Sequence, residues 1–291
     1  MDYYLENAHL TVRISSLGAQ LQQIINADGT EYLWYGDPTY WGGRSPILFP
    51  FVGRLKDCQY LLNGVKYPLE IHGFARKCDF SVCHATKTQL DFLLVSNDVT
   101  QAVYPYDFQL HILYTLLDDT LGITYLVQNN SKTTMYFGLG AHPGFRVPLD
   151  RGKTFEDYRI ELLGQAGTPM RVGFSADCLI NGNDEPYLLN ADAALPLRHT
   201  LFDNDAIFLS NVAKQARLTA GDGHSITLFY PDMTYLGIWH TPKTKAPFVC
   251  IEPWTSLPGR HDIVEDFATM PSLIHLPAQQ SKTFCWSMTF A

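Results

Sequence analysis

Apolar and polar residues alternate with a period of two along most of the chain. In the segment 10–15, for example, Leu10, Val12 and Ile14 fall on one face of an extended strand and the intervening residues on the other. The same alternation, with many Ile, Val, Tyr, Phe and Thr residues, predicts strands at 10–15, 89–96, 108–116, 122–129, 158–163, 225–231, 235–240, 247–252 and 282–290.

Turn-forming segments rich in Gly, Asn and Asp separate these strands, and helical periodicity is limited to short turns near 98–105 and 261–267. Many short strands at this spacing are typical of an antiparallel all-β protein, a sandwich or a barrel. Because Gly and Pro are spread evenly and no linker or repeat interrupts the chain, we expect one large domain over 1–291. The irregular stretch 36–57 is longer than a simple turn, and such loops are usually functional.

Composition excludes several classes of protein. With 46% hydrophobic and 17% charged residues, the 291-residue chain has the composition of a globular protein. A net charge of −8 argues against a nucleic-acid partner, which would require a basic surface. We expect no membrane segment and a cytoplasmic location, because no export signal or long apolar run is found. The six cysteines lack a CxxC or framework spacing, which predicts reduced thiols, and no motif predicts a metal or a cofactor.

Four short stretches place ionisable residues among apolar and aromatic neighbours. They are FPFVGRL with Arg54, IHGFAR with His72 and Arg76, GLGAHPGF with His142, and FVCIEPW with Glu252. Each residue alone has a structural interpretation, as a surface pair or a turn hydrogen bond. Together they fit a polar site in an aromatic-lined cleft better than four unrelated contacts.

The chemistry of this set is that of proton transfer. A carboxylate with a raised pKa is a general base, a histidine is a general acid, and arginines and a second histidine donate to hydroxyls or to a developing oxyanion. The apolar neighbours of Glu252 favour a raised pKa, whereas the arginines favour a lowered one, and the sequence leaves the outcome open. Several aromatic side chains are candidates for stacking on a sugar ring: Trp34, Trp41, Phe49, Phe51, Trp239 and Trp254.

These motifs, in this order, resemble the aldose 1-epimerase (galactose mutarotase-like) superfamily, and specifically its LacX-like branch. The resemblance extends over nearly the whole chain, through ISSLGAQLQQI (14–24), the segment 31–55, IHGFAR, AHPGF, FDNDAIF (202–208) and CIEPW. It implies a large antiparallel β-supersandwich whose concave face binds a small-molecule aldose or sugar phosphate. It also implies a cofactor-independent isomerase that interconverts the α and β anomers of a hexose.

The resemblance also implies residue roles. Glu252 resembles the base that removes the proton from the C1 hydroxyl, and His142 resembles the acid that protonates the ring oxygen. His72 and Arg54 match residues that bind hydroxyls near the reacting centre. Asp205 matches the sugar-binding aspartate, with Asp203 as the alternative.

The sequence departs from the true galactose mutarotases at AHPGF and IHGFAR. HGFAR resembles the hexose-6-phosphate 1-epimerase branch, so Arg76, helped by Arg44 and Lys77, is a candidate phosphate ligand, or else a structural ion-pair residue.

Two alternative functions and two further questions stay open at this stage. One alternative is a non-catalytic sugar-binding or sensing protein, and another is a glycosidase that pairs Glu252 with Asp205. The identity of the sugar and the choice between monomer and homodimer are not determined by the sequence.

Overall fold

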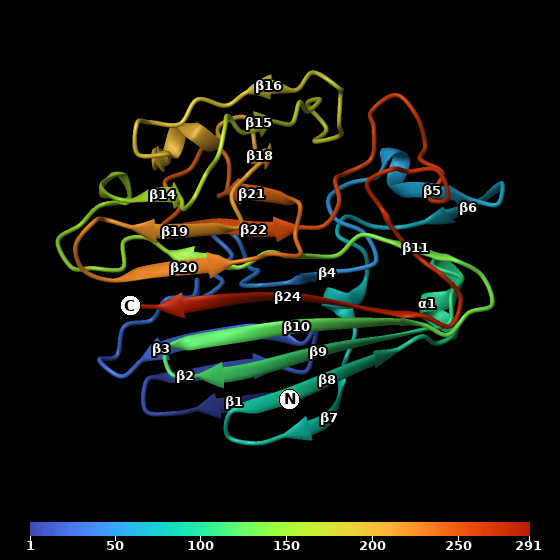
Figure 1. Cartoon of the computed structure of the whole chain (residues 1–291), viewed down its shortest axis with the longest axis horizontal. Coiled ribbons are helices and arrows are strands. Elements are labelled where there is room, and N and C mark those ends of the chain that lie inside the picture. Colours follow the sequence, from blue (N-terminus) through green and yellow to red (C-terminus); the bar gives the residue numbers. More distant parts are fainter.

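The computed structural model describes all residues 1–291 and is built around two large antiparallel sheets (Figure 1). The larger sheet has nine strands. In spatial order they are β17 (Ala194–Pro196), β14 (Arg159–Leu162), β19 (Gln215–Thr219), β20 (Ser225–Phe229), β24 (Ser281–Phe290), β10 (Thr120–Asn129), β9 (Phe108–Leu117), β8 (Gln89–Val95) and β7 (Ser81–Ala85).

The second sheet has eight strands, and most of them lie above β24, β10, β9, β8 and β7 of the larger sheet in Figure 1. In spatial order they are β16 (Glu185–Pro186), β15 (Met170–Arg171), β18 (Ile207–Ser210), β21 (Tyr235–Trp239), β22 (Phe248–Trp254), β12 (Gly140–Ala141) and β4 (Ile47–Leu48), with β13 (Gly144–Arg146) also paired to β22.

Smaller elements complete the fold. The short sheets are formed by β1 (Asp2–Glu6), β2 (Leu10–Ser15) and β3 (Gln20–Asn26), by β5 (Gln59–Leu62) and β6 (Val65–Pro68), and by β11 (Met135–Phe137) and β23 (Ile274–Leu276). The helices are α1 (Asp98–Val103) and four 3-10 turns, η1 (Lys56–Cys58), η2 (Ala75–Lys77), η3 (Phe155–Asp157) and η4 (His199–Phe202). No helix has the length and apolar character needed to span a membrane.

The predicted antiparallel all-β class is confirmed, and a strand overlaps each of the nine predicted segments. The helical turn predicted near 98–105 is confirmed as α1, whose first turn is capped by the side chain of Asn97. The prediction of a helical turn at 261–267 is wrong. The backbone donors of this segment bond to distant segments instead, from His261 to the carbonyl of Ile180 and from Phe267 to that of Leu61.

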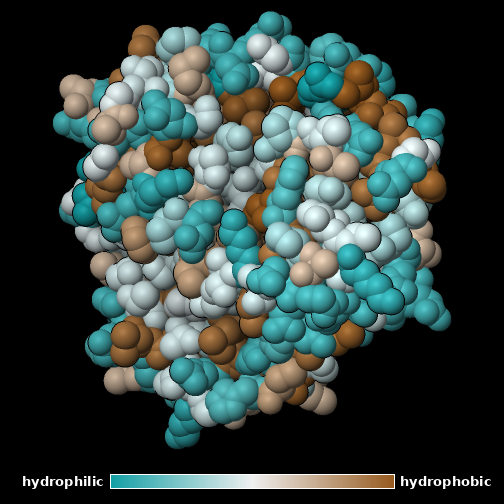
Figure 2. Space-filling model, turned by 45° about the vertical axis from the view of Figure 1, so that its right-hand side comes forward, coloured by the Kyte–Doolittle hydropathy of each residue, from teal (hydrophilic) through white to brown (hydrophobic).

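One continuous core joins the two large sheets. Ile112 of β9, Ile123 of β10 and Ile251 of β22 are almost completely buried within the same cluster of apolar side chains. Only alternate residues of β9 and β10 are buried, because one face of the nine-stranded sheet is turned to solvent. Hydrophobic residues form small groups among hydrophilic ones on the face in Figure 2.

Strand β22 differs, because it is buried on both faces along its whole length. Val249 and Ile251 belong to the main core, whereas Cys250 and Trp254 belong to two smaller apolar clusters. Glu252 lies between these two in the sequence, on the face that is turned away from the main core. The strand therefore carries a carboxyl group into an apolar layer on the far side of the sheet.

Candidate active site

A cavity of about 340 Å³ opens on this face of the eight-stranded sheet, within the range of small-molecule sites. Its lining combines aromatic, cationic and acidic side chains from segments far apart in the sequence. The predicted site residues that line it are Arg54, His72, Arg76, His142, Asp205, Trp239 and Glu252. The structure thus gathers these seven residues around one cavity.

Glu252 is placed by the pairing of β22 with β21. Its partner in the register is Gly237, and a Cβ atom there would come within 2.6 Å of the Phe208 ring and 3.2 Å of the Glu252 Cβ. The glycine therefore leaves the space that the Phe208 ring and the base of the Glu252 side chain occupy. Glu252 is only 1% exposed, and its Oε2 atom accepts no hydrogen bond.

Burial raises the pKa of the Glu252 carboxyl well above its usual value, and the negative charge of Asp205 raises it further. Burial is thus the dominant influence on this carboxyl, and the opposing influence is that of the Trp254 side chain rather than the charge of an arginine. A carboxyl group with a raised pKa is a stronger base once it is ionised.

His142 is held next to Glu252 by an interruption between two strands. It lies between β12 and β13, both paired with β22, and the carbonyl of Pro143 accepts a hydrogen bond from the backbone N–H of Ile251. The imidazole stacks on Trp41 with ring centroids 4.9 Å apart. Its Nε2 atom lies 3.4 Å from Oε2 of Glu252, whereas its Nδ1 atom is buried without a hydrogen-bond partner.

The same burial has the opposite effect on the pKa of His142, because the charged form of an imidazole is the protonated one. Burial lowers the pKa of His142 to about 3, so the imidazole is neutral in the unliganded pocket at ordinary pH. Its ring and the Glu252 carboxylate also lie near the Cys250 thiol, with ligand atoms within 4.8 Å of one another. Burial raises the pKa of that thiol well above its usual value.

His72 is oriented by the loop that carries Gly53. The backbone N–H of His72 donates to the Gly53 carbonyl, and the Gly53 N–H donates to Nδ1 of His72 at 3.1 Å. Because Nδ1 accepts a hydrogen bond, the neutral ring carries its proton on Nε2. The turn needs positive φ at His72 and at Gly73, where a Cβ would come within 2.3 Å of the Phe49 carbonyl oxygen.

Two arginines supply positive charge to the cavity. The Arg54 side chain is exposed, whereas Arg76 is partly buried and donates from Nη2 to the Ile71 carbonyl at 3.2 Å. The Nε atom of Arg76 is buried and has no partner. The proposed helpers lie elsewhere: Arg44 binds the Gln22 carbonyl, Lys77 pairs with Glu70, and neither lines the cavity.

Of the two candidate aspartates, Asp205 lines the cavity and Asp203 does not. Asp203 lines a neighbouring groove, which Asp205 also borders. Oδ2 of Asp205 accepts a hydrogen bond from the thiol of Cys178 at 3.1 Å, and Oδ1 accepts one from the N–H of Ala206. Sequence reasoning missed Cys178, which carries no motif and contacts Asp205 only through the fold.

The aromatic candidates divide into two sets. Trp41, Trp239 and Trp254 line the cavity. Trp34, Phe49 and Phe51 do not, since they are completely buried in the apolar clusters, so the prediction that they contact a sugar is wrong. The sequence shows that these residues are aromatic and close to the motifs, but the direction of a side chain depends on the register of its strand.

Comparison with known proteins assigns the chain to a family. The model of the family described as Aldose 1-epimerase matches residues 1–263. The chain belongs to the aldose 1-epimerase family. Among curated relatives of this aldose 1-epimerase family member, the plasmid and chromosomal LacX proteins of Lactococcus lactis subsp. lactis are each 32% identical over 265 residues, which is 88% of either chain.

Solved structures agree with this assignment. A galactose mutarotase related enzyme from Lactobacillus acidophilus is 34% identical, with a TM-score of 0.94 over 100% of this chain and 97% of its own. A galactose mutarotase-like protein from Lactobacillus casei is 33% identical, with a TM-score of 0.95 over 100% of both chains. The β-sandwich of this family member is therefore that of the galactose mutarotase-like proteins.

Proposed function

We propose that this protein catalyses the interconversion of the α and β anomers of a hexose by general acid/base chemistry. The observation that carries the proposal is the pair formed by Glu252 and His142, whose side chains lie 3.4 Å apart in the wall of one sugar-sized cavity. Their pKa values are shifted in opposite directions, which is typical of an acid and a base that share a site.

In the proposed reaction, Glu252 accepts the proton of the C1 hydroxyl while His142 donates a proton to the ring oxygen. The C1–O bond of the ring breaks, the C1 carbonyl forms, and the sugar becomes an open-chain aldehyde. Rotation about C1–C2 then exposes the other face of the carbonyl. Ring closure returns both protons and gives the second anomer, so the enzyme ends in its starting state.

The opposite pKa shifts, both caused by burial, bear on the proton count of the reaction. Ring opening converts a Glu252 carboxylate and a His142 imidazolium into a neutral acid and a neutral imidazole, with one shared proton in both states. The dry pocket favours the neutral form, because burial penalises each charge. The same environment therefore favours the neutral carboxylic acid and neutral imidazole, which are the forms present when the sugar is an open-chain aldehyde.

Other residues of the cavity are assigned to substrate binding. Nε2 of His72 and the guanidinium of Arg54 are donors for hydroxyl groups close to C1, and Asp205 accepts from another hydroxyl. Trp239 and Trp41 offer aromatic faces to the apolar face of the sugar ring. A protein that only binds sugar needs hydroxyl ligands and aromatic faces, but it does not need a buried acid and base with shifted pKa values.

Anomer exchange of the wild-type protein tests this proposal. Freshly dissolved α-glucose or α-galactose is expected to reach its anomeric equilibrium faster with the protein than in buffer, as measured by polarimetry or by NMR exchange spectroscopy. A panel of aldoses then identifies the preferred sugar. Measurable sugar binding without acceleration for any aldose would contradict catalysis and favour a sensing role.

A hexose 6-phosphate is the second candidate substrate, and Arg76 supports it because its buried Nε atom is without a partner. Replacing Arg76 by methionine is expected to lower kcat/KM for the 6-phosphate, relative to the free hexose, by about tenfold or more, the magnitude of one charge-assisted hydrogen bond. Lys77→Met is the matched control, because Lys77 is a neighbouring exposed cation that does not line the cavity. An unchanged ratio would instead favour the free hexose.

A further inference from the structure

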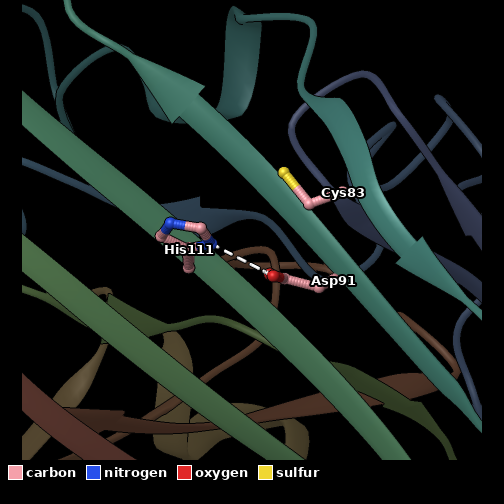
Figure 3. Close-up of side chains that lie close together, drawn as sticks. All are labelled: Cys83, Asp91 and His111. Atoms are coloured by element: carbon pink, nitrogen blue, oxygen red, sulfur yellow. Dashed lines mark hydrogen bonds and ion pairs between the residues drawn. The ribbon is translucent and has the colours of Figure 1, made fainter.

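A second cluster of ligand-type side chains lies outside the cavity, at the edge of the nine-stranded sheet. It consists of Cys83 on β7, Asp91 on β8 and His111 on β9, three neighbouring strands (Figure 3). The thiol, a carboxylate oxygen and a ring nitrogen all lie within 4.8 Å of one another. None of these residues lines the sugar cavity.

The strand pattern places Asp91 and His111 on the outer face of the sheet, where their side chains are 22% and 21% exposed. Leu90 and Phe92, which flank Asp91, are buried in the core, and the residues flanking His111 are buried as well. Asp91 and His111 therefore point to the opposite, outer face of the sheet. They are diagonal neighbours, because the register pairs His111 with Leu93.

A β-bulge adds the thiol to this face. The register of β7 and β8 shifts between Val82 and His84, so that Cys83 is the extra residue opposite Asp91. His84 is the register partner of Asp91, and paired residues of an antiparallel sheet share a face. The bulge thus places the Cys83 thiol beside the Asp91 carboxylate, and the exposed His84 is the next residue on the strand. Bulges commonly re-aim side chains in this way.

We propose that Cys83, Asp91 and His111 form a binding site for a thiophilic divalent cation, Zn²⁺. A thiolate, an imidazole and a carboxylate are the three ligand types that zinc uses in proteins. The Nδ1 atom of His111 already lies 3.1 Å from Oδ2 of Asp91. Two ligands that each bind zinc at its usual distance with a tetrahedral angle are about 3.3 Å apart, so this pair needs almost no movement.

The thiol completes the site by rotation of an exposed side chain. Binding displaces the thiol proton to solvent and leaves the fourth position open to water or to the His84 ring. The site joins the edge strand β7 to β8 and β9, so bound zinc would also hold this edge of the sheet in register.

Cobalt absorption spectroscopy tests the proposal on the full chain, with a non-thiol reductant present. Wild type is expected to bind Co²⁺ with a near-ultraviolet thiolate-to-cobalt band and visible bands of a tetrahedral site, all removed by added Zn²⁺. Cys83→Ser is expected to lose the thiolate band. Asp91→Asn and His111→Gln are expected to weaken binding by more than about tenfold, because even second-shell changes cost 10–100-fold.

Two cysteine variants serve as matched controls. Cys285 is exposed on the outer face of the same sheet, and Cys250 belongs to the buried cluster beside Glu252, so Cys285→Ser and Cys250→Ser are expected to keep the spectrum. Zinc is also expected to raise the melting temperature of wild type but not of Cys83→Ser. Absence of the thiolate band in wild type, or its persistence in Cys83→Ser, would overturn the assignment.

Discussion

Replacing Glu252 by glutamine is expected to lower kcat/KM for anomer exchange by about a thousandfold, the usual contribution of a positioned general base. That loss corresponds to roughly 4 kcal/mol of transition-state stabilisation. Glutamine has the shape of the carboxyl group and fits the space opposite Gly237, but it cannot accept the C1 proton. Polarimetry or NMR exchange at saturating and limiting sugar measures the effect.

Glu161→Gln provides the matched control. Glu161 is also a buried carboxyl, but it lies on β14 of the other large sheet and pairs with Arg159 and Arg217. Its replacement is expected to lower stability, because two arginines lose their partner, while anomer exchange continues. Equal rates for wild type and Glu252→Gln would show that Glu252 is not the base.

Glu252→Gln is also expected to make the unliganded protein more stable than wild type as the pH rises. Burial raises the pKa of Glu252 above the ordinary value of 4.5, so the folded state holds the carboxyl proton more tightly than the unfolded state. Wild type therefore loses stability as pH rises from about 4.5 through the raised pKa, whereas glutamine does not titrate. In thermal unfolding, the melting temperature of Glu252→Gln should rise relative to that of wild type across this pH range. Below this range the difference between the two proteins should not change.

Much of the fold could be predicted from the sequence because its long strands are buried on one face only. β9 and β10 alternate clearly between apolar and polar positions, and their predicted bounds lie within two residues of those in the structure. Strands with less contrast were missed, such as β7, which is mostly exposed, and β18, which is mostly buried. Without alternation, a strand of four or five residues gives no periodic signal.

The site was predictable to the extent that its residues lie in motifs. Glu252 and His142 are ionisable residues with mainly apolar neighbours in the sequence, and this can be seen without a structure. Cys178 is different, because its contact with Asp205 joins residues 27 positions apart through the fold alone. The direction of the pKa shift of Glu252 was also out of reach, since it depends on which opposing groups are near the carboxyl group in space.

Raising the pH is expected to abolish the enzyme-catalysed rate of anomer exchange. This rate is obtained by measuring the spontaneous rate at each pH and subtracting it. The proposed cycle needs one proton on the Glu252–His142 pair, whichever residue carries it. Burial lowers the pKa of His142 to about 3 and raises that of Glu252, so the pair holds one proton between these two values. kcat/KM should therefore form a plateau that falls tenfold per pH unit beyond the raised pKa.

This alkaline fall separates two mechanisms. If Glu252 acted alone as the base and neutral His142 only oriented the sugar, kcat/KM would rise through the pKa of Glu252 and then stay constant. With His142 as the acid, loss of the shared proton removes the donor to the ring oxygen. In His142→Asn, the small residual rate should accordingly rise with pH where wild type falls. Circular dichroism at each pH shows that both proteins stay folded. A wild-type rate that rises with pH would assign His142 to binding rather than to proton transfer. A general acid cannot act once the Glu252–His142 pair has lost its last proton, so the rate would then have to fall.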